Sequence, residues 1–549
     1  MRTLSLEEKI LKSTKKILSR EFPIPSKLLP SLFLEIPKDK KFGDLSTNIA
    51  LKLSKTLNKP PLEIASEICS HLRKEDFFKE EILDLKVEPP GFINFFLKED
   101  FFYKVLKDIL KRKSNFGRQF AKKKVLIEFV SANPTGPLTI AHGRQAAVGD
   151  ALANILEFCG FKVEREYYLN DTGVQIELLA RSIQARYKEL LGEETEFPPT
   201  GYRGEYIYDI AKGIIESQKK FKILDVKFFK DFGIRDILNT TKRDLKDFGV
   251  KFDNFYSEKA LRETKKIAYV IKLLEKKGVL YEKEGALWFR STQFGDDKDR
   301  VIVKSNKELT YFLPDIVYHR DKFRRGFCWL INFWGPDHHG YIKRLKAALI
   351  ALGFREEDIT IKIVQLATLY KDQRPIQMST RKGEFITLRE VCDEVGKDCA
   401  RFFFLMRRTD SHLDFDLELA KKKSLENPIY YIQYAHARIS GILNSVKDLH
   451  KKIFSSNLEL LRSPFELEIL KLLFRFPYVL RLCCQLCDPY PITSYLFGLA
   501  SGFHRFYESC RVLGEAEDLS SARLALIYGT KVILKRGLAL LGISAPQRM

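Results

Sequence analysis

The sequence predicts an α/β protein built around a parallel sheet, with an α+β segment before the sheet and an all-helical segment after it. The first observation is the β-rich apolar run VLIEFV at 125–130, which a turn-rich stretch ends and a helical pattern follows from about Ala141. The second is another strand, turn and helix at 160–187. The third is the almost wholly helical pattern beyond Asp410. Repeated strand–helix units favour a Rossmann-type sheet, in which a helix N-terminus faces a nucleotide phosphate.

Composition indicates a large globular chain with a polyanionic partner. The 549 residues are enough for roughly three or four domains. The 94 Lys and Arg against 72 Asp and Glu give a formal net charge of +22, which is spread along the chain. Cations that neutralise phosphates release counterions, so nucleic acid is the expected partner. A basic surface that is merely solvated remains the alternative.

The chain shows no membrane or disulfide pattern. No run of 18 apolar residues lacks a charge, and the amphipathic first residues lack the apolar core of a secretory signal, so a cytoplasmic protein is expected. Nine cysteines are too sparse for a disulfide framework. Cys483, Cys484 and Cys487 lie in an apolar helix-like run, which favours buried thiols over structural zinc.

Domain limits are predicted at 1–112, 120–408 and 409–549, with a basic linker between the first two. Residues of about 190–285 are charged and mostly helical by pattern, so they are expected to be insertions on the sheet. Leu85 to Leu97 predicts two strands joined by a Pro-Pro-Gly turn. Phe92 and Asn94 in the second strand could stack on and hydrogen-bond to an unpaired base, although Phe92 could equally be core.

Two further stretches carry candidate binding residues. Tyr311 and Asp315 are four residues apart and share a face if this stretch is helical. A carboxylate and a phenol there could hold a guanidinium, whereas a surface or capping Asp is the commoner reading. Gly335 and Asp337, at the end of the strand that begins at Trp329, suit a ribose. The neighbouring histidines of that turn would rarely converge on one ion, so no protein-bound metal is expected.

Residues 128–144, EFVSANPTGPLTIAHGR, resemble the first signature of class I aminoacyl-tRNA synthetases, in the form found in arginyl-tRNA synthetases. Thr139 replaces the first histidine of that signature and Ala141 its glycine, while His142 is kept. Residues 377–383, QMSTRKG, resemble the second signature with Gln377 and Thr380 in place of its lysines. TYFLPD, GPDHHG and the terminal helices resemble further family segments in the same order, so the resemblance covers essentially the whole chain.

The resemblance implies an arginine–tRNA ligase: ATP, with Mg²⁺, and arginine give arginyl-adenylate and pyrophosphate, and arginine then passes to the 3′-terminal ribose of tRNA(Arg). It also implies an N-terminal domain that meets the tRNA elbow and a C-terminal domain that binds the anticodon; a monomer without membrane contact is expected. The implied roles are catalytic for His142, Ser379, Arg381 and Lys382; arginine binding for Glu128, Ser131, Asn133, Tyr311 and Asp315; ATP binding for Ala141, His142, Gly335, Asp337, His338 and Met378; and tRNA binding for Phe92, Asn94, Tyr434 and Met549.

Two other readings remain open. A class I synthetase for another amino acid would share the sheet and the signatures. A tRNA-binding relative without catalytic activity would account for the departures at Thr139, Ala141 and Thr380. Whether amino-acid activation requires bound tRNA is also open.

Overall fold

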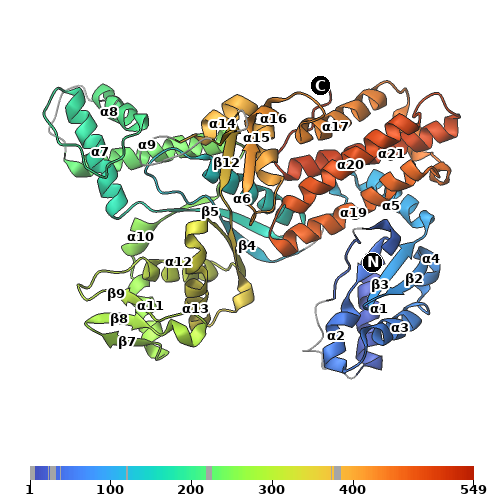
Figure 1. The fold of residues 1–549 in the computed structure, drawn as a ribbon, viewed down its shortest axis with the longest axis horizontal. Helices are drawn as coiled ribbons and strands as arrows, with labels where there is room; N and C mark the ends of the chain where they lie inside the picture. The colour runs from blue at the N-terminus through green and yellow to red at the C-terminus, as the bar shows by residue number, and fades with distance from the viewer. Residues whose placement is uncertain are drawn as a thin grey trace.

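The computed structural model describes residues 6–22, 24, 32–37, 39–118, 121–217, 225–371, 374–375 and 385–549. Its centre is a five-stranded sheet of order β11-β10-β4-β5-β6 in which every neighbouring pair is parallel (Figure 1). The strands are β4 (Lys124–Glu128), β5 (Lys162–Leu169), β6 (Asn254–Ser257), β10 (Trp329–Trp334) and β11 (Ile359–Ile363). Their carboxyl ends therefore share one edge, and the predicted α/β fold class is confirmed.

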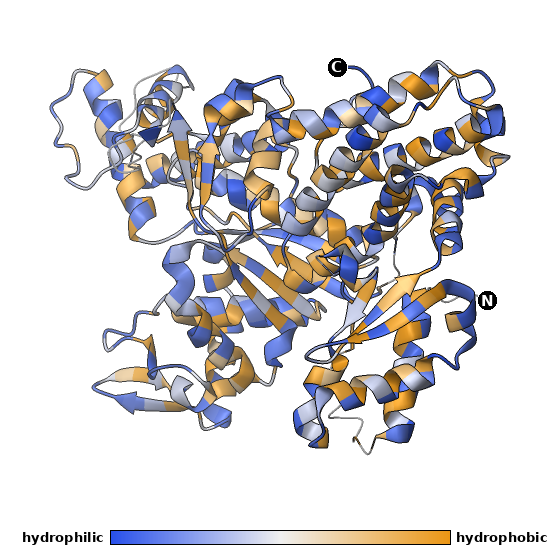
Figure 2. Cartoon of the chain, turned by 45° about the vertical axis from the view of Figure 1, so that its right-hand side comes forward, coloured by the Kyte–Doolittle hydropathy of each residue, from blue (hydrophilic) through white to orange (hydrophobic). Residues whose placement is uncertain are grey.

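Helix α6 (Ile140–Phe158) packs against the sheet directly after β4. Val125, Leu126 and Ile127 of β4 are fully buried, as expected for a strand covered on both faces. Gly149 of α6 lies against Phe129, where an added Cβ would come within 2.2 Å of the ring. Glycine is therefore needed for this close approach of helix and strand. The central strands carry many hydrophobic residues, and the helices alternate hydrophobic and hydrophilic stretches (Figure 2).

Two lobes extend from the sheet. The helical lobe has its own apolar cluster and consists of α7 (Val174–Leu190), α8 (Glu205–Ser217) and α9 (Val226–Asp247). The mixed lobe consists of α10 (Glu258–Arg262), α11 (Lys266–Lys276), β7 (Leu280–Lys283), β8 (Ala286–Phe289), β9 (Arg300–Val303), α12 (Phe312–Arg324) and α13 (Ile342–Leu352). The expectation that 190–285 are only insertions is wrong for β6, which pairs with β5 in the central sheet. A four-residue strand with polar ends is too short to show a pattern.

The N-terminal segment forms an α+β unit. Its antiparallel sheet of order β1-β3-β2 contains the predicted two-stranded hairpin. The elements are β1 (Leu45–Thr47), β2 (Ile82–Glu88), β3 (Phe92–Leu97), α1 (Leu6–Glu21), α2 (Ile49–Leu57), α3 (Pro61–Leu72), α4 (Asp76–Glu81) and α5 (Glu99–Arg112). Phe101 and Phe102 of α5 pack edge-on against Phe474 of the C-terminal helices. The N-terminal unit thus contacts the C-terminal helices, although the central sheet separates the two in the sequence.

A small second sheet joins the central domain to the C-terminal helices. It consists of β12 (Ala367–Lys371), β13 (Arg374–Pro375) and β14 (Leu413–Asp416), with α14 (Leu388–Val395) and α15 (Lys397–Leu405) in the same stretch. β12 and β14 pair in parallel. β14 lies beyond the boundary predicted at 409, so the purely helical part begins later than the sequence pattern indicated.

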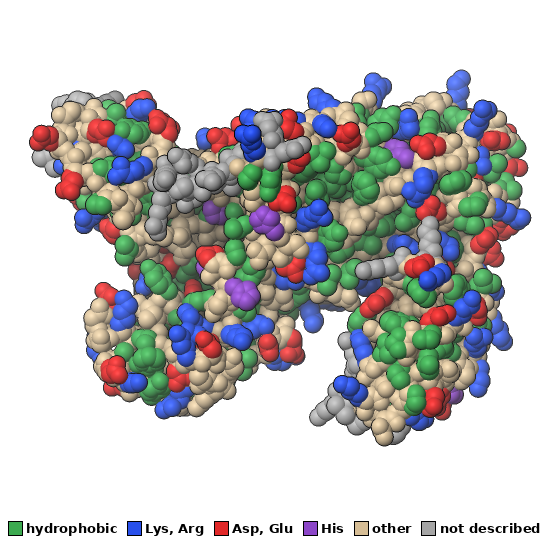
Figure 3. Space-filling view, in the orientation of Figure 1, with side chains coloured by type: hydrophobic (Ala, Val, Ile, Leu, Met, Phe, Trp, Pro, Cys, Tyr) green, Lys and Arg blue, Asp and Glu red, His purple; other side chains and the backbone are tan. Residues whose placement is uncertain are grey.

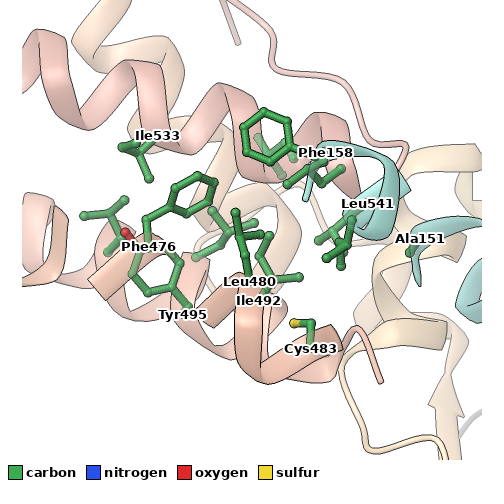
Figure 4. Packing of buried hydrophobic residues seen from close by; sticks show 14 of the residues in the cluster. Ala151, Phe158, Phe476, Leu480, Cys483, Ile492, Tyr495, Ile533 and Leu541 are labelled. Atoms are coloured by element: carbon green, nitrogen blue, oxygen red, sulfur yellow. The ribbon is translucent and has the colours of Figure 1, made fainter. Parts of the chain in front are cut away.

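The C-terminal part consists of α16 (Leu417–Lys421), α17 (Pro428–Asn444), α18 (Leu449–Phe454), α19 (Pro464–Leu486), α20 (Tyr490–Ser509) and α21 (Glu517–Leu540). Ala151 and Phe158 of α6 share one core with this bundle, and Cys483 is buried in the same core (Figure 4). Within the described ranges, no helix is long and apolar enough to cross a membrane. Helix α6 therefore packs against both the sheet and the bundle within one continuous core.

Candidate active site

A cavity of about 550 Å³ opens at the carboxyl edge of the central sheet. Residues that follow β4, β5, β6 and β10 line it, together with the start of α12. Open α/β sheets bind their ligands at this edge. Histidine side chains gather near the middle of the molecule in Figure 3, between the two lobes. The cavity brings together nine of the residues that the sequence singled out: Glu128, Ser131, Asn133, His142, Tyr311, Asp315, Gly335, Asp337 and His338.

The loop after β4 turns sharply into the cavity. Val130 and Ser131 have φ angles of +67° and +40°, which side chains other than glycine rarely adopt. The Ser131 hydroxyl accepts the Tyr168 backbone N–H at 3.0 Å and lies 3.3 Å from a Glu128 carboxylate oxygen. The Asn133 amide donates to the side chain of Gln175, at the start of α7, at 2.7 Å. The strained turn thus aims polar side chains at one end of the cavity.

A buried polar relay connects the two ends of the cavity. The fully buried Lys322 donates to Glu128 at 2.5 Å and to the Asn332 side chain at 3.2 Å. The Asn332 amide faces His319 Nε2 at 2.6 Å, and His319 Nδ1 lies 2.8 Å from the Asp315 carbonyl. Burial holds the pKa of His319 well below its usual range, so the ring is neutral. Lys322 offsets the charge of Glu128, but no cation is hydrogen-bonded to the Asp315 carboxylate among the described residues.

Asp315 lies in the first turn of α12 and faces the cavity. The helix that the sequence analysis made a condition is present from Phe312, and Tyr311 is the residue just before it. The Tyr341 hydroxyl donates to Asp315 at 2.6 Å. Burial, together with the charges of Glu258 and Glu128, raises the pKa of Asp315 to about 7, against the hydrogen bond from Tyr341. This end of the cavity therefore favours a cationic ligand.

Tyr168 adds an unpaired phenol to the same wall. Its side chain lines the cavity, and its ring centroid lies 4.4 Å from that of Tyr318, with the two rings tilted by 36°. Its hydroxyl is buried and has no hydrogen-bond partner in the described part of the chain. Burial, with Asp315 and Glu258 nearby, raises its pKa far above the usual range, so the group stays protonated. A buried hydroxyl without a partner costs about 1–3 kcal/mol, which a polar ligand would recover.

His142 lies in the first turn of α6, at the other end of the cavity. Thr139 is the N-cap residue, and its backbone N–H donates to His142 Nδ1 at 3.1 Å. Because an N–H can only donate, Nδ1 is the acceptor, and the neutral ring carries its proton on Nε2. Burial lowers the pKa of His142 to about 4. His142 is therefore a neutral hydrogen-bond donor at the N-terminus of a 19-residue helix.

The turn after β10 supplies the third wall. Gly335 allows the carboxylate of Asp337 to fold back, because an added Cβ would meet an Asp337 oxygen at 2.6 Å. The same carboxylate lies 3.2 Å from His338 Nδ1. Asp337 and His338 remain largely solvent-exposed and accessible to a ligand.

The remaining predicted residues lie elsewhere. Ala141 does not line the cavity, and Met378, Ser379, Arg381 and Lys382 lie outside the described residues. Phe92 is half-buried. Asn94 is only 2% exposed and accepts a hydrogen bond from Ser46 at 2.7 Å, so in this conformation it is not the surface amide that the sequence suggested. β3 is the middle strand of its sheet, and helices α2 and α3 also pack against it.

Tyr434 lies on α17 beside Tyr430, and the Arg438 guanidinium covers its ring at 4.8 Å. The C-terminal segment lies along the same helix, because His436 Nδ1 is 2.7 Å from the Pro546 carbonyl. Met549, at the end of this segment, is half-exposed.

Several site residues escaped the sequence analysis, among them Tyr168, Glu258 and Lys322. Glu258 opens α10 directly after β6 and accepts from Arg262 at 2.6 Å. Its place at the end of a sheet strand could have been found only if β6 had been recognised. Lys322 lies 194 residues from its partner Glu128, and no local pattern joins the two.

Comparison with known proteins covers the whole chain. Residues 5–97 match the family model described as the arginyl tRNA synthetase N terminal domain, 105–410 that of the class I (R) tRNA synthetase catalytic domain, and 432–549 that of the DALR anticodon binding domain. The arginine–tRNA ligases of Citrifermentans bemidjiense and Syntrophotalea carbinolica are 47% and 45% identical over 534 and 532 residues, 95% of each chain. The Thermus thermophilus arginyl-tRNA synthetase structure, 21% identical, aligns over 99% of this chain and 100% of its own with a TM-score of 0.79.

Proposed function

The chain belongs to the arginyl-tRNA synthetase family and charges tRNA(Arg) with arginine, and from this premise we propose which side chains bind each substrate. ATP use follows from the class. The observation that carries the assignment is the pair of carboxylates, Asp315 and Glu258, at one end of a cavity whose other end begins at His142. Arginine and ATP can therefore lie together in one cavity, with the guanidinium at the carboxylate end and the reacting phosphate at the His142 end.

Asp315 and Glu258 bind the arginine guanidinium, with Tyr311 at the cavity mouth. A guanidinium offers five N–H donors in a planar fork, which matches carboxylate oxygens, whereas an ammonium is a compact point charge. A neutral competitor would leave the Asp315 carboxylate without a counter-charge, whereas Glu258 already accepts from Arg262, so steep discrimination depends mainly on Asp315. This supports arginine selection without a separate editing domain.

Glu128, Ser131 and Asn133 bind the α-amino end and backbone of arginine. Lys322 occupies one oxygen of Glu128, which leaves the other for the substrate ammonium. The strained turn at Ser131 keeps its hydroxyl at this end of the cavity. Arginine is thus held at both ends, and its carboxylate faces the nucleotide side.

The reaction needs no covalent protein nucleophile. A carboxylate oxygen of arginine attacks the α-phosphorus of ATP, a new C–O–P bond forms, and pyrophosphate leaves with the former α–β bridging oxygen. His142 donates its Nε2–H to phosphate oxygens, while Gly335, Asp337 and His338 accommodate the ribose and base. Ser379, Arg381 and Lys382 hold the leaving group, with Met378 and Ala141 beside the adenine. In the second step, the terminal ribose hydroxyl of tRNA attacks the arginyl carbonyl and AMP leaves.

Magnesium enters with ATP in this proposal. Within the described residues, no group of three or more His, Cys, Asp or Glu side chains is arranged to hold an ion. Mg²⁺ commonly takes phosphate and water ligands with at most one or two carboxylates, so in this proposal most of its ligands come from ATP and water. The ion supplies neutralisation of charge on the phosphates.

The tRNA contacts both ends of the chain. The aromatic surface of α17 and α20, with Arg438 between Tyr434 and Tyr507, offers rings on which unpaired anticodon bases stack, and Met549 lies on the same C-terminal segment. Phe92 stacks on a base of the tRNA elbow, and Asn94 contributes to it after local rearrangement. The chain acts as a monomer.

Aminoacylation of total tRNA with each of the twenty labelled amino acids, with ATP and Mg²⁺, tests the proposal. Charging with arginine alone is expected. Charging with another amino acid would refute the assignment of Asp315 and Glu258. Retention of tRNA on a filter without any charging would favour a binding-only relative and make Thr139 and Ala141 the changed positions to revert.

A further inference from the structure

Arg144 lies two residues beyond His142 on α6 and points away from the cavity. Two helical positions rotate by about 200°, so the two side chains leave opposite sides of the helix. Arg144 is fully buried. Its guanidinium donates to the Gln365 carbonyl at 2.7 Å, the Leu366 carbonyl at 3.4 Å and the Arg408 carbonyl at 2.9 Å. No carboxylate is hydrogen-bonded to it in the described part of the chain.

These carbonyls belong to two separate segments that enter one sheet. Gln365 and Leu366 directly precede β12, and Arg408 stands shortly before β14. β12 and β14 pair in parallel from Ala367 with Leu413 onward. One side chain of α6 therefore fixes the start of both strands of the small sheet.

The electrostatics show that burial here is costly. Burial lowers the pKa of Arg144 to about 10, against the charges of Asp488 and Asp410. The Arg144 Nε has no hydrogen-bond partner among the described residues. Asp488 itself accepts the backbone N–H groups of Thr409 and Tyr490, each at 2.9 Å. An apolar side chain would fill the same space without a desolvation cost, but it could not bridge two segments. Only a forked donor can do so.

We infer that Arg144 is a positioning residue for arginine activation, which fixes the small sheet of β12 and β14 relative to the helix that carries His142. Arg144 touches no substrate. It sets the position of His142 relative to strand β12. The second signature sequence, 377–383, follows β12 in the chain. This inference rests on the proposed function. Charging by the wild-type protein is therefore measured first, so that a failure of the proposed function is not mistaken for a failure of the positioning role of Arg144.

The test compares Arg144→Lys with Arg401→Lys. Arg401 is an equally buried arginine, bonded to the Leu541 and Phe248 carbonyls and to Asp150 further along α6, but it lies outside the cavity and the small sheet. Lysine keeps the charge and loses the fork. Both variants should lower Tm to a similar extent, while only Arg144→Lys should lower kcat of ATP–pyrophosphate exchange more than tenfold.

The pattern across constants separates positioning from general destabilisation. Arg144→Lys should leave the KM for arginine and the filter-binding affinity for tRNA within about threefold of wild type, because Arg144 touches no substrate. A tenfold change in either constant would correspond to about 1.4 kcal/mol. A loss of kcat no larger than in Arg401→Lys, or a parallel loss of arginine affinity, would overturn the inference.

Asp488→Asn provides a second test that leaves Arg144 intact. It weakens the bonds to the Thr409 segment and removes the charge that offsets Arg144. The same isolated fall in kcat is expected at smaller size, about threefold to tenfold. If Arg144→Lys does not fold and Asp488→Asn shows unchanged kcat, the inference is wrong.

Discussion

Replacing Asp315 by Asn removes charge from the guanidinium end of the cavity while keeping the side-chain shape. Asp315 is half-buried, accepts a hydrogen bond from Tyr341 at 2.6 Å and is hydrogen-bonded to no cation among the described residues. Loss of one partner of a buried, hydrogen-bonded ion pair costs about 2–5 kcal/mol. Asn retains a hydrogen-bonding oxygen, so the lower limit applies, and kcat/KM for arginine should fall roughly 30-fold.

The pH profile makes this prediction specific. The pKa of Asp315 is about 7 in the free site, so below pH 7 the group is increasingly protonated. A cation binds the ionised form, and kcat/KM for arginine should fall about tenfold per pH unit as the pH drops below 7. Above pH 7 the profile should be flat. In Asp315→Asn this acid limb should disappear, while kcat at saturating arginine changes less.

Asp321→Asn is the matched control. Asp321 lies on the same helix, is buried, and accepts from Tyr256 at 3.0 Å as Asp315 accepts from Tyr341, but it does not line the cavity. Its variant should keep the acid limb and the wild-type KM for arginine. A flat wild-type profile between pH 5.5 and 7.5, or an unaltered KM in Asp315→Asn, would remove Asp315 from the arginine site.

Other variants test the rest of the cavity. Tyr168→Phe removes an unpartnered hydroxyl, so Tm should not fall, while the KM for arginine should rise about tenfold if the hydroxyl binds substrate; an unchanged KM refutes that contact. Glu258→Gln should raise the KM for arginine roughly 30-fold and leave the KM for ATP unchanged in exchange assays. His142→Ala should lower turnover roughly 100-fold with unchanged tRNA retention on filters, and equal turnover would disprove the phosphate contact. Thr139→Ala should lower the stability of α6 by about 1 kcal/mol, seen as a lower Tm, with a smaller loss of turnover than His142→Ala, because the backbone N–H still holds Nδ1.

The fold was predictable where the sequence pattern is local. The strand, loop and helix around Glu128 and His142 and the turn at Gly335 each follow from residues within a few positions of one another. Parallel strands then bring these separate stretches to one edge, so the fold itself predicts that they meet. Most of the cavity could be inferred in this way.

What the sequence could not predict depends on long-range contacts. Lys322 in a charged helix resembles any surface lysine until the fold buries it against Glu128. Asn94 reads as a surface amide, but in the folded chain it is 2% exposed and accepts a hydrogen bond from Ser46 of the neighbouring strand. Tyr168 is one of two neighbouring tyrosines in β5, and only the three-dimensional arrangement leaves its hydroxyl without a hydrogen-bond partner among the described residues.

The change at Thr139 illustrates the same limit for chemistry. From sequence, Thr139 is the loss of a signature histidine and a reason to doubt catalysis. In the structure, its backbone N–H donates to His142 Nδ1, a contact that any residue except proline could make, and its hydroxyl lies 3.1 Å from the same nitrogen, so Thr139 itself helps to orient the remaining histidine. With the pKa of His142 near 4 and that of Asp315 near 7, the two groups titrate in separate pH ranges. An acid limb near pH 7 therefore reports arginine binding, and one near pH 4 would report His142, so a single pH profile can distinguish a defect in the arginine pocket from a defect in the altered signature.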